Sequence, residues 1–171
     1  MCIRDRDNVA FFKGSEIELF CPKELGKASE FVLSKKSSVL SLKAETHNFP
    51  TAVEPFFGAS TGSGGEIRDR MAGGTGSMPL AGTAVYMTAY PRLGKGLGKK
   101  RYEAVYKERD WKYQSPAEIL TKASNGASDF GNKFGQPLIC GSLLTFEGKV
   151  GKDFYAYDLS LIHISEPTRP Y

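Results

Sequence analysis

The chain has 171 residues, a formal net charge of +4 and 40% hydrophobic residues. This composition is typical of one soluble globular domain with its own core, and so mild a net charge does not indicate the clustered basic surface of a nucleic-acid-binding protein. No apolar run approaches the roughly 20 residues of a membrane span, and no signal peptide opens the chain, so we expect a cytoplasmic protein without nucleic-acid or membrane partners. Cys2, Cys21 and Cys140 are too scattered to predict a disulfide framework or a zinc site.

Both ends of the chain read as foreign sequence. Residues 1–6 (MCIRDR) and 159–170 (LSLIHISEPTRP) resemble in-frame translations of a transposase adaptor used in sequencing libraries, one for each strand. The alternative for the second stretch is a native polar tail. We expect residues 1–6 and 159–171 to be non-native, which makes residues 7–158 an internal piece of a longer protein with His47 as its single histidine.

The first third of the chain alternates in the manner of strands. Strands are predicted at Val9–Phe12 and Ile17–Phe20, on either side of a Gly14–Ser15 turn, and a third strand at Ser38–Thr46. A short helix is predicted between them, at 27–33. The strand at Ser38–Thr46 places Leu40, Leu42 and Ala44 on one face, and its other face carries Val39, Ser41, Lys43, Glu45 and, just beyond its end, His47.

The rest of the chain mixes helices and strands. Ser115-Pro116-Ala117-Glu118 is a capping box that begins a helix running to about Asp129. The other expected elements, in chain order, are one helical turn at Thr51–Phe57, a glycine loop at 58–65, a helix at Glu66–Met71, a loop at 73–79, a strand at Leu80–Tyr90, a basic loop at 91–100, a surface helix at Arg101–Trp111, and strands at Leu138–Phe146 and Phe154–Tyr157. This alternation predicts an α+β or α/β fold without Rossmann spacing.

The stretch Lys43–Arg70 gathers most of the chemistry. Its glycine loop would offer unobstructed backbone N–H groups before a helix N-terminus, an arrangement that binds phosphate, although a plain turn explains it equally well. Glu45, Glu66 and Asp69 would supply the hard oxygen ligands of Mg²⁺, with surface carboxylates as the alternative for each one alone.

Charged side chains in the same stretch suit a nucleotide. Lys43 would give a point charge for a phosphate, and Arg68 would bind a second phosphate bidentately. His47 belongs to the residue type that most often serves as a general base, although a lone histidine is more often structural.

Several motifs together resemble the family of phosphoribosylformylglycinamidine synthases, of the large single-chain type. They are KAETHNFPTAVEP followed by GASTGSGGEIRDRMAGG, then PLAGTAVYMTAYPR (Pro79–Arg92) and KASNGASDFGNKFGQPLICGSLLTFE (Lys122–Glu147). The resemblance covers nearly all of residues 7–158. A related selenophosphate synthetase-like or hydrogenase-maturation enzyme of the aminoimidazole ribonucleotide (AIR) synthetase superfamily is the rival, but it should lack SNGASDFGNKFGQP beside ETHNFP.

The resemblance implies an incomplete α+β domain of the AIR-synthetase (PurM) N-terminal type, whose mixed sheet pairs into a barrel with a second half of the same polypeptide. Residues 7–37 would end a linker region and 38–158 would belong to the first synthetase domain. The implied enzyme is a glutamine-dependent ligase of purine biosynthesis that takes formylglycinamide ribonucleotide and ATP. A second synthetase half and a glutaminase domain would complete it. This piece alone is expected to be inactive and to aggregate or self-pair.

The resemblance also implies residue roles. His47 would be the proton acceptor, Glu45 and Asp69 would bind Mg²⁺, and Arg68 would hold the substrate phosphate. ATP would contact Lys43, Gly58, Ala59, Ser60, Thr61, Gly62, Ser63, Gly64, Gly65 and Glu66, and the substrate would be lined by Thr46, His47, Asn48 and Phe49. Phe49 departs from a family pattern that often has a second histidine there, and Ser60 replaces a common alanine. One alternative stays open, namely that this half is a non-catalytic nucleotide-binding scaffold.

Overall fold

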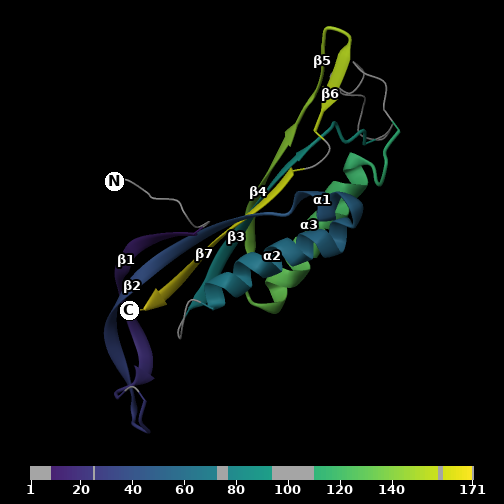
Figure 1. The fold of residues 1–171 in the computed structure, drawn as a ribbon. Coiled ribbons are helices and arrows are strands. Elements are labelled where there is room, and N and C mark those ends of the chain that lie inside the picture. Colours follow the sequence, from purple (N-terminus) through teal and green to yellow (C-terminus); the bar gives the residue numbers. More distant parts are fainter. Residues whose placement is uncertain (1–8, 25, 73–76, 94–109, 158–159, 171) are drawn as a thin grey trace.

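The computed structural model describes residues 9–24, 26–72, 77–93, 110–157 and 160–170 (Figure 1). Its elements are β1 (Val9–Pro22), β2 (Phe31–Thr46), α1 (Asn48–Val53), α2 (Pro55–Met71), β3 (Met78–Thr88), α3 (Pro116–Lys133), β4 (Leu138–Thr145), β5 (Glu147–Val150), β6 (Asp153–Ala156) and β7 (Ser160–Pro170). None of the helices in these ranges is long and apolar enough to cross a membrane.

Five strands form one mixed sheet in the order β1-β2-β7-β3-β4, and β5 and β6 form a separate hairpin. β3 and β4 run parallel, whereas the other neighbouring pairs are antiparallel. The connection between parallel strands needs a crossover, and α3 provides it. Helices α2 and α3 lie together on one face of the sheet (Figure 1). This is the α+β architecture with a mixed sheet that the sequence predicted.

Strand β7 joins the two halves of the sheet. It pairs with β2 from Ser38 opposite Pro170 to Thr46 opposite Ile162, and with β3 from Met78 opposite Thr168 to Met87 opposite Ser160. β2 and β3 therefore meet only through β7. β7 falls in the stretch that is expected to be non-native. The two halves of the sheet are therefore joined by residues that lie outside the motifs of the family resemblance.

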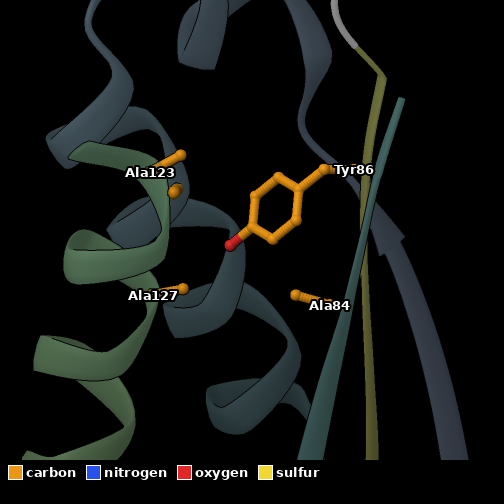
Figure 2. Close-up of a cluster of buried hydrophobic side chains, with 5 residues drawn as sticks. Ala84, Tyr86, Ala123 and Ala127 are labelled. Carbon is orange, nitrogen blue, oxygen red and sulfur yellow. The ribbon is translucent and has the colours of Figure 1, made fainter. Parts of the chain in front are cut away.

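The core between sheet and helices is built around one aromatic ring. Tyr86 projects from β3 toward α2 and α3, and Figure 2 shows its ring among small side chains, Ala84 beside it and Ala123 and Ala127 facing it from α3. Ala59 of α2 completes the cluster. Small residues on both helices let them approach the sheet closely, and the Tyr86 ring fills the remaining space.

The hydroxyl of Tyr86 is buried and has no hydrogen-bond partner among the described residues. Burial raises the pKa of Tyr86 to about 12, so the group stays a neutral phenol that loses its bonds to water on folding. Substituting phenylalanine removes this unpaired group and keeps the ring. We expect Tyr86→Phe to stabilise the chain by about 1 kcal/mol, measured by chemical denaturation, and a Tyr86→Phe chain less stable than its parent would show that the hydroxyl is paired.

The glycine loop predicted at 58–65 is wrong, because these residues are helical. α2 begins at Pro55, in the favoured first-turn position for proline, and continues without a break to Met71. Each glycine inside a helix lowers helix stability by about 1 kcal/mol relative to alanine. For this reason the sequence predicted a loop. Tertiary packing overrides that cost, since a Cβ at Gly58 would lie 2.5 Å from the Cα of Thr51 and one at Gly64 would lie 2.7 Å from the Phe130 ring.

The short helix predicted at 27–33 is also wrong, because β2 already begins at Phe31. The rings of Phe20 and Phe31 lie 5.4 Å apart on adjacent strands, and this cross-strand aromatic contact favours extended backbone. The two strands predicted before it form one irregular strand, with a register shift between Lys13 and Glu16.

The helix predicted from the capping box is confirmed. The Ser115 side chain accepts from the backbone N–H of Glu118, the Glu118 carboxylate accepts from the backbone N–H of Ser115, and α3 runs one turn further than expected. Hydrogen bonds from Ser115 lower the pKa of Glu118. Strands β3 and β4 match the predicted ones to within two residues at each end. The helix expected at 101–111 falls mostly outside the described residues, as does most of the 91–100 loop.

Candidate functional site

Lys43 forms the centre of the candidate site. Its Nζ lies 3.1 Å from Glu45 Oε2 and makes a second ion pair with Asp69 Oδ2 on α2. Lys43 and Glu45 are two residues apart on β2, so their contact confirms that they project from the same face of the strand. The structure thus brings together three predicted site residues from two segments of chain.

The Lys43 ammonium is buried, with only 4% of the residue exposed. Burial by itself would lower the pKa of Lys43, but hydrogen bonds to Asp69 and Glu45 outweigh it and raise the pKa. Lys43 is therefore charged at neutral pH. One positive and two negative charges leave the cluster net negative, which favours an additional cation.

α2 carries two predicted carboxylates that point in different directions. Asp69 is half exposed and reaches Lys43, whereas Glu66 is fully buried beneath the helix. The Oδ2 atom of Asp69 contacts Lys43, on another element, and not a neighbouring arginine of its own helix. The Glu66 carboxylate therefore does not reach the exposed face of α2.

His47 lies beyond the end of β2, at the residue that precedes α1. Strand alternation consequently stops before it and does not place it beside Lys43 and Glu45. Its backbone carbonyl accepts from Thr51 Oγ1, while its Nδ1 is buried without a hydrogen-bond partner in the described part of the chain. An imidazole nitrogen in that state has lost the hydrogen bond that it would make to water.

The remaining predicted substrate residues lie on exposed surface. Thr46, Asn48 and Phe49 are exposed at the junction of β2 and α1. Arg68 is exposed on α2, where its Nε donates to the carbonyl of Gly64 at 3.1 Å and its guanidinium lies over the Phe130 ring. An exposed guanidinium suits an anionic ligand.

The predicted ATP stretch spans much of α2 and does not form a compact loop. Gly58 and Glu66, its two ends, are about 12 Å apart along the helix axis. Gly58, Ala59, Gly62, Ser63 and Gly64 are buried in helix packing, whereas Ser60, Thr61 and Gly65 reach the surface. The backbone N–H groups inside a helix are already bonded, so the phosphate-cradle argument made from a loop does not apply to this segment.

The structure also contains a cavity that sequence reasoning missed. It has a volume of about 280 Å³ and three aromatic walls, Phe49, Trp111 and Tyr113. Phe49 and Tyr113 meet edge to face with ring centroids 6.1 Å apart, and Lys112 lies over the Tyr113 ring. The single tryptophan of the chain could have signalled it, but only tertiary packing brings Trp111 beside α1.

The chemistry of the donor set fits Mg²⁺. Glu45 and Asp69 present carboxylate oxygens that are 29% and 54% exposed at the side chain, and Mg²⁺ prefers one or two carboxylates together with phosphate and water. Within the described ranges, no group of three or more His, Cys, Asp or Glu side chains is placed to hold a metal ion. A metal at Glu45 and Asp69 would therefore need ligands from a bound nucleotide.

Comparison with known proteins gives one consistent answer. No family model matches the chain. Phosphoribosylformylglycinamidine synthase of Dictyostelium discoideum is 40% identical over 139 residues, and that of Homo sapiens is 38% identical over 139 residues; each alignment covers 79% of this chain and 10% of the relative. The chain thus spans about a tenth of the length of the curated relatives it matches.

Solved structures show the same fold. Thermotoga maritima PurL complexed with FGAR (formylglycinamide ribonucleotide) aligns with a TM-score of 0.50 at 24% identity, over 78% of this chain and 16% of that one. Phosphoribosylformylglycinamidine synthase II of the same organism aligns with a TM-score of 0.53 at 14% identity, over 80% of this chain and 19% of that one. The fold expected from the motifs is confirmed, and so is the resemblance itself: this chain is homologous to a segment that makes up about a tenth of phosphoribosylformylglycinamidine synthases.

Proposed function

We propose that this chain supplies one wall of the nucleotide and metal site of a phosphoribosylformylglycinamidine synthase. The whole ligase would convert formylglycinamide ribonucleotide, ATP and glutamine to the amidine, ADP, phosphate and glutamate. The observation that carries the proposal is the Lys43 cluster, which consists of Lys43, Glu45 and Asp69. Lys43 comes from the first motif of the family resemblance, and its ion pair with Asp69 joins that motif to the second.

Each residue has a role in phosphoryl transfer to the formamide oxygen, a step that requires positioning and charge neutralisation more than covalent help. Lys43 would contact ATP, and Glu45 and Asp69 would hold Mg²⁺, which supplies positive charge to the phosphates when bound. Arg68 would bind the substrate phosphate. The surface residues of α2, Ser60, Thr61 and Gly65, would face the nucleotide, whereas Glu66 would act from beneath the helix.

The junction of β2 and α1 would line the substrate. Thr46, Asn48 and Phe49 are exposed there, and the aromatic cavity beside Phe49 offers stacking surface for a planar group. His47 would accept the proton that ammonia loses when it displaces phosphate from the activated formamide. Its position between the exposed residues Thr46 and Asn48, directly before α1, supports this role. Solved Thermotoga maritima PurL structures with FGAR, ADP and AMPPCP support a substrate and nucleotide site in this fold.

The larger organisation is part of the same proposal. Residues 7–37 end a linker region, 38–158 belong to the first synthetase domain, and 1–6 and 159–171 are adaptor-derived. A second synthetase half and a glutaminase domain complete the cytoplasmic enzyme. The small share of each relative that this chain covers supports the need for further domains.

A second candidate function is a nucleotide-binding scaffold without catalysis. It is favoured by the Lys43 ammonium, which already contacts both candidate metal ligands, Glu45 and Asp69, and so occupies the space between them. In this case the nucleotide would be structural, and amidine synthesis would depend on residues of the other half.

His47→Ala in the full-length protein separates these functions. We expect it to abolish amidine formation, measured with ammonia as the nitrogen donor, because no other group described near this junction offers a free imidazole nitrogen. Glutaminase activity should persist, which shows that the variant folds. Exposed Glu16→Gln on β1 serves as the control and should retain both activities. Near-normal amidine synthesis by His47→Ala would favour the scaffold.

A further inference from the structure

Glu66 and Gln136 form an isolated polar contact inside the molecule. Glu66 lies on the buried side of α2 and Gln136 on the turn between α3 and β4, and their exposed fractions are 0% and 3%. Gln136 Nε2 donates to Glu66 Oε1 at 3.1 Å. The backbone N–H of Gln136 donates to the Gly131 carbonyl at 2.9 Å, which fixes the base of its side chain.

Two oxygens of this contact lack a partner. Glu66 Oε2 and Gln136 Oε1 are buried without a hydrogen bond in the described part of the chain. The Glu66 carboxyl and the Gln136 carboxamide are both planar groups with two terminal atoms. One atom of each group already takes part in the hydrogen bond from Nε2 to Oε1, and these two oxygens are the other atoms. If Glu66 were ionised, both oxygens could only accept hydrogen bonds, and each would remain unsatisfied at a considerable cost. A single proton on Glu66 Oε2 would satisfy both.

We propose that Glu66 is held as a neutral acid that pairs reciprocally with Gln136, and that the two are positioning residues which fasten α2 to the start of β4. The carboxamide N–H donates to Glu66 Oε1, and the carboxyl O–H on Oε2 donates to Gln136 Oε1. This is one planar ring of two hydrogen bonds between a carboxylic acid and an amide. Neither group needs water or a counter-ion.

The surroundings are consistent with a neutral carboxyl. Burial raises the pKa of Glu66 to about 8; the charge of Glu45 raises it further, while the hydrogen bond from Gln136 and the charge of Lys43 lower it. On its own helix the charged residues within the next four positions are Arg68, Asp69 and Arg70, and the contact from the turn before β4 is the neutral Gln136. β3 leaves room for the amide, since a Cβ at Gly82 would lie 2.7 Å from Gln136 Nε2.

The pair has a consequence for the candidate site. Asp69 follows Glu66 by three residues, or about 4.5 Å along α2. Fixing Glu66 against the sheet layer therefore fixes the height of Asp69 beside Lys43. This consequence rests on the proposed function, whereas the protonation and pairing do not.

Infrared spectroscopy of the unmodified chain tests the pair directly. Ordinary carboxyls of glutamate titrate near pH 4.3, so at pH 7 we expect one remaining carbonyl stretch of a protonated carboxyl. Glu66→Gln should remove it, and the exposed control Glu16→Gln should not. Gln136→Leu should shift the band to higher frequency by removing the amide partner. A parent chain without the band at pH 7, or a band unshifted in Gln136→Leu, would overturn the proposal.

The pH dependence of unfolding gives a second test. The folded-state pKa of about 8 exceeds the ordinary value of 4.5, so the stabilising proton is fully present below pH 4.5 and is lost as pH rises toward 8. The unfolding constant should therefore rise about tenfold per pH unit across that window from this group. Glu66→Gln, whose amide can pair with Gln136, should flatten this dependence relative to Glu16→Gln. An unchanged slope in Glu66→Gln would contradict the pair whatever the function of the site.

Discussion

Removing residues 159–171 is expected to abolish cooperative unfolding of this chain. β7 lies between β2 and β3 and hydrogen-bonds to both, so its loss leaves two unpaired strand edges in the middle of the sheet. Exposed backbone edges of this kind pair with other chains. Circular dichroism during heating should lose its sharp transition, and size-exclusion chromatography should show aggregates.

Removing residues 1–6 is the control for this experiment. β1 begins only at Val9, so this second deletion leaves the described sheet intact and should preserve the melting transition. A truncated chain ending at Asp158 that remains monomeric with a sharp melting transition would contradict the structural role of β7. It would also contradict the expectation that the native piece alone aggregates. If residues 159–171 are foreign, whatever natural segment follows Asp158 should restore the transition when appended.

Gly126→Ala is expected to destabilise the chain by about 3 kcal/mol. α3 approaches α2 so closely at this position that an added Cβ would lie 2.0 Å from the backbone oxygen of Phe56. Backbone cannot move aside as a flexible side chain does, so the two helices must separate. That separation also loosens Ala123 and Ala127 from the Tyr86 ring (Figure 2). Chemical denaturation of the variant against its parent measures the loss.

Gly65→Ala is the matched control. Gly65 is also helical, has ordinary backbone conformation, and an added Cβ meets nothing within 4 Å. Alanine should therefore stabilise α2 by about 1 kcal/mol through its higher helix propensity. Opposite signs for the two substitutions would show that packing, and not helix propensity, explains the glycine at position 126. A Gly126→Ala chain as stable as its parent would show that the helices have room to separate.

Local patterns predicted the parts of the site that depend on local geometry. The two-residue period of a strand placed Lys43 and Glu45 on one face, and their contact confirms it. The capping box placed the start of α3, because both of its hydrogen bonds form within four residues. The same period does not extend to His47, since β2 ends at Thr46 and α1 begins at Asn48.

The sequence by itself determined the α+β class, the family resemblance and the two segments that supply Lys43, Glu45 and Asp69. These features follow from short-range periodicity and from motifs. Only the tertiary structure decided that the glycine stretch is a helix, because the close approach of α3 and α1 outweighs the low helix propensity of glycine. It likewise decided that Glu66 faces inward to Gln136, seventy residues away, and that β7 closes the sheet. Contacts between residues so distant in sequence leave no periodic signal along the chain.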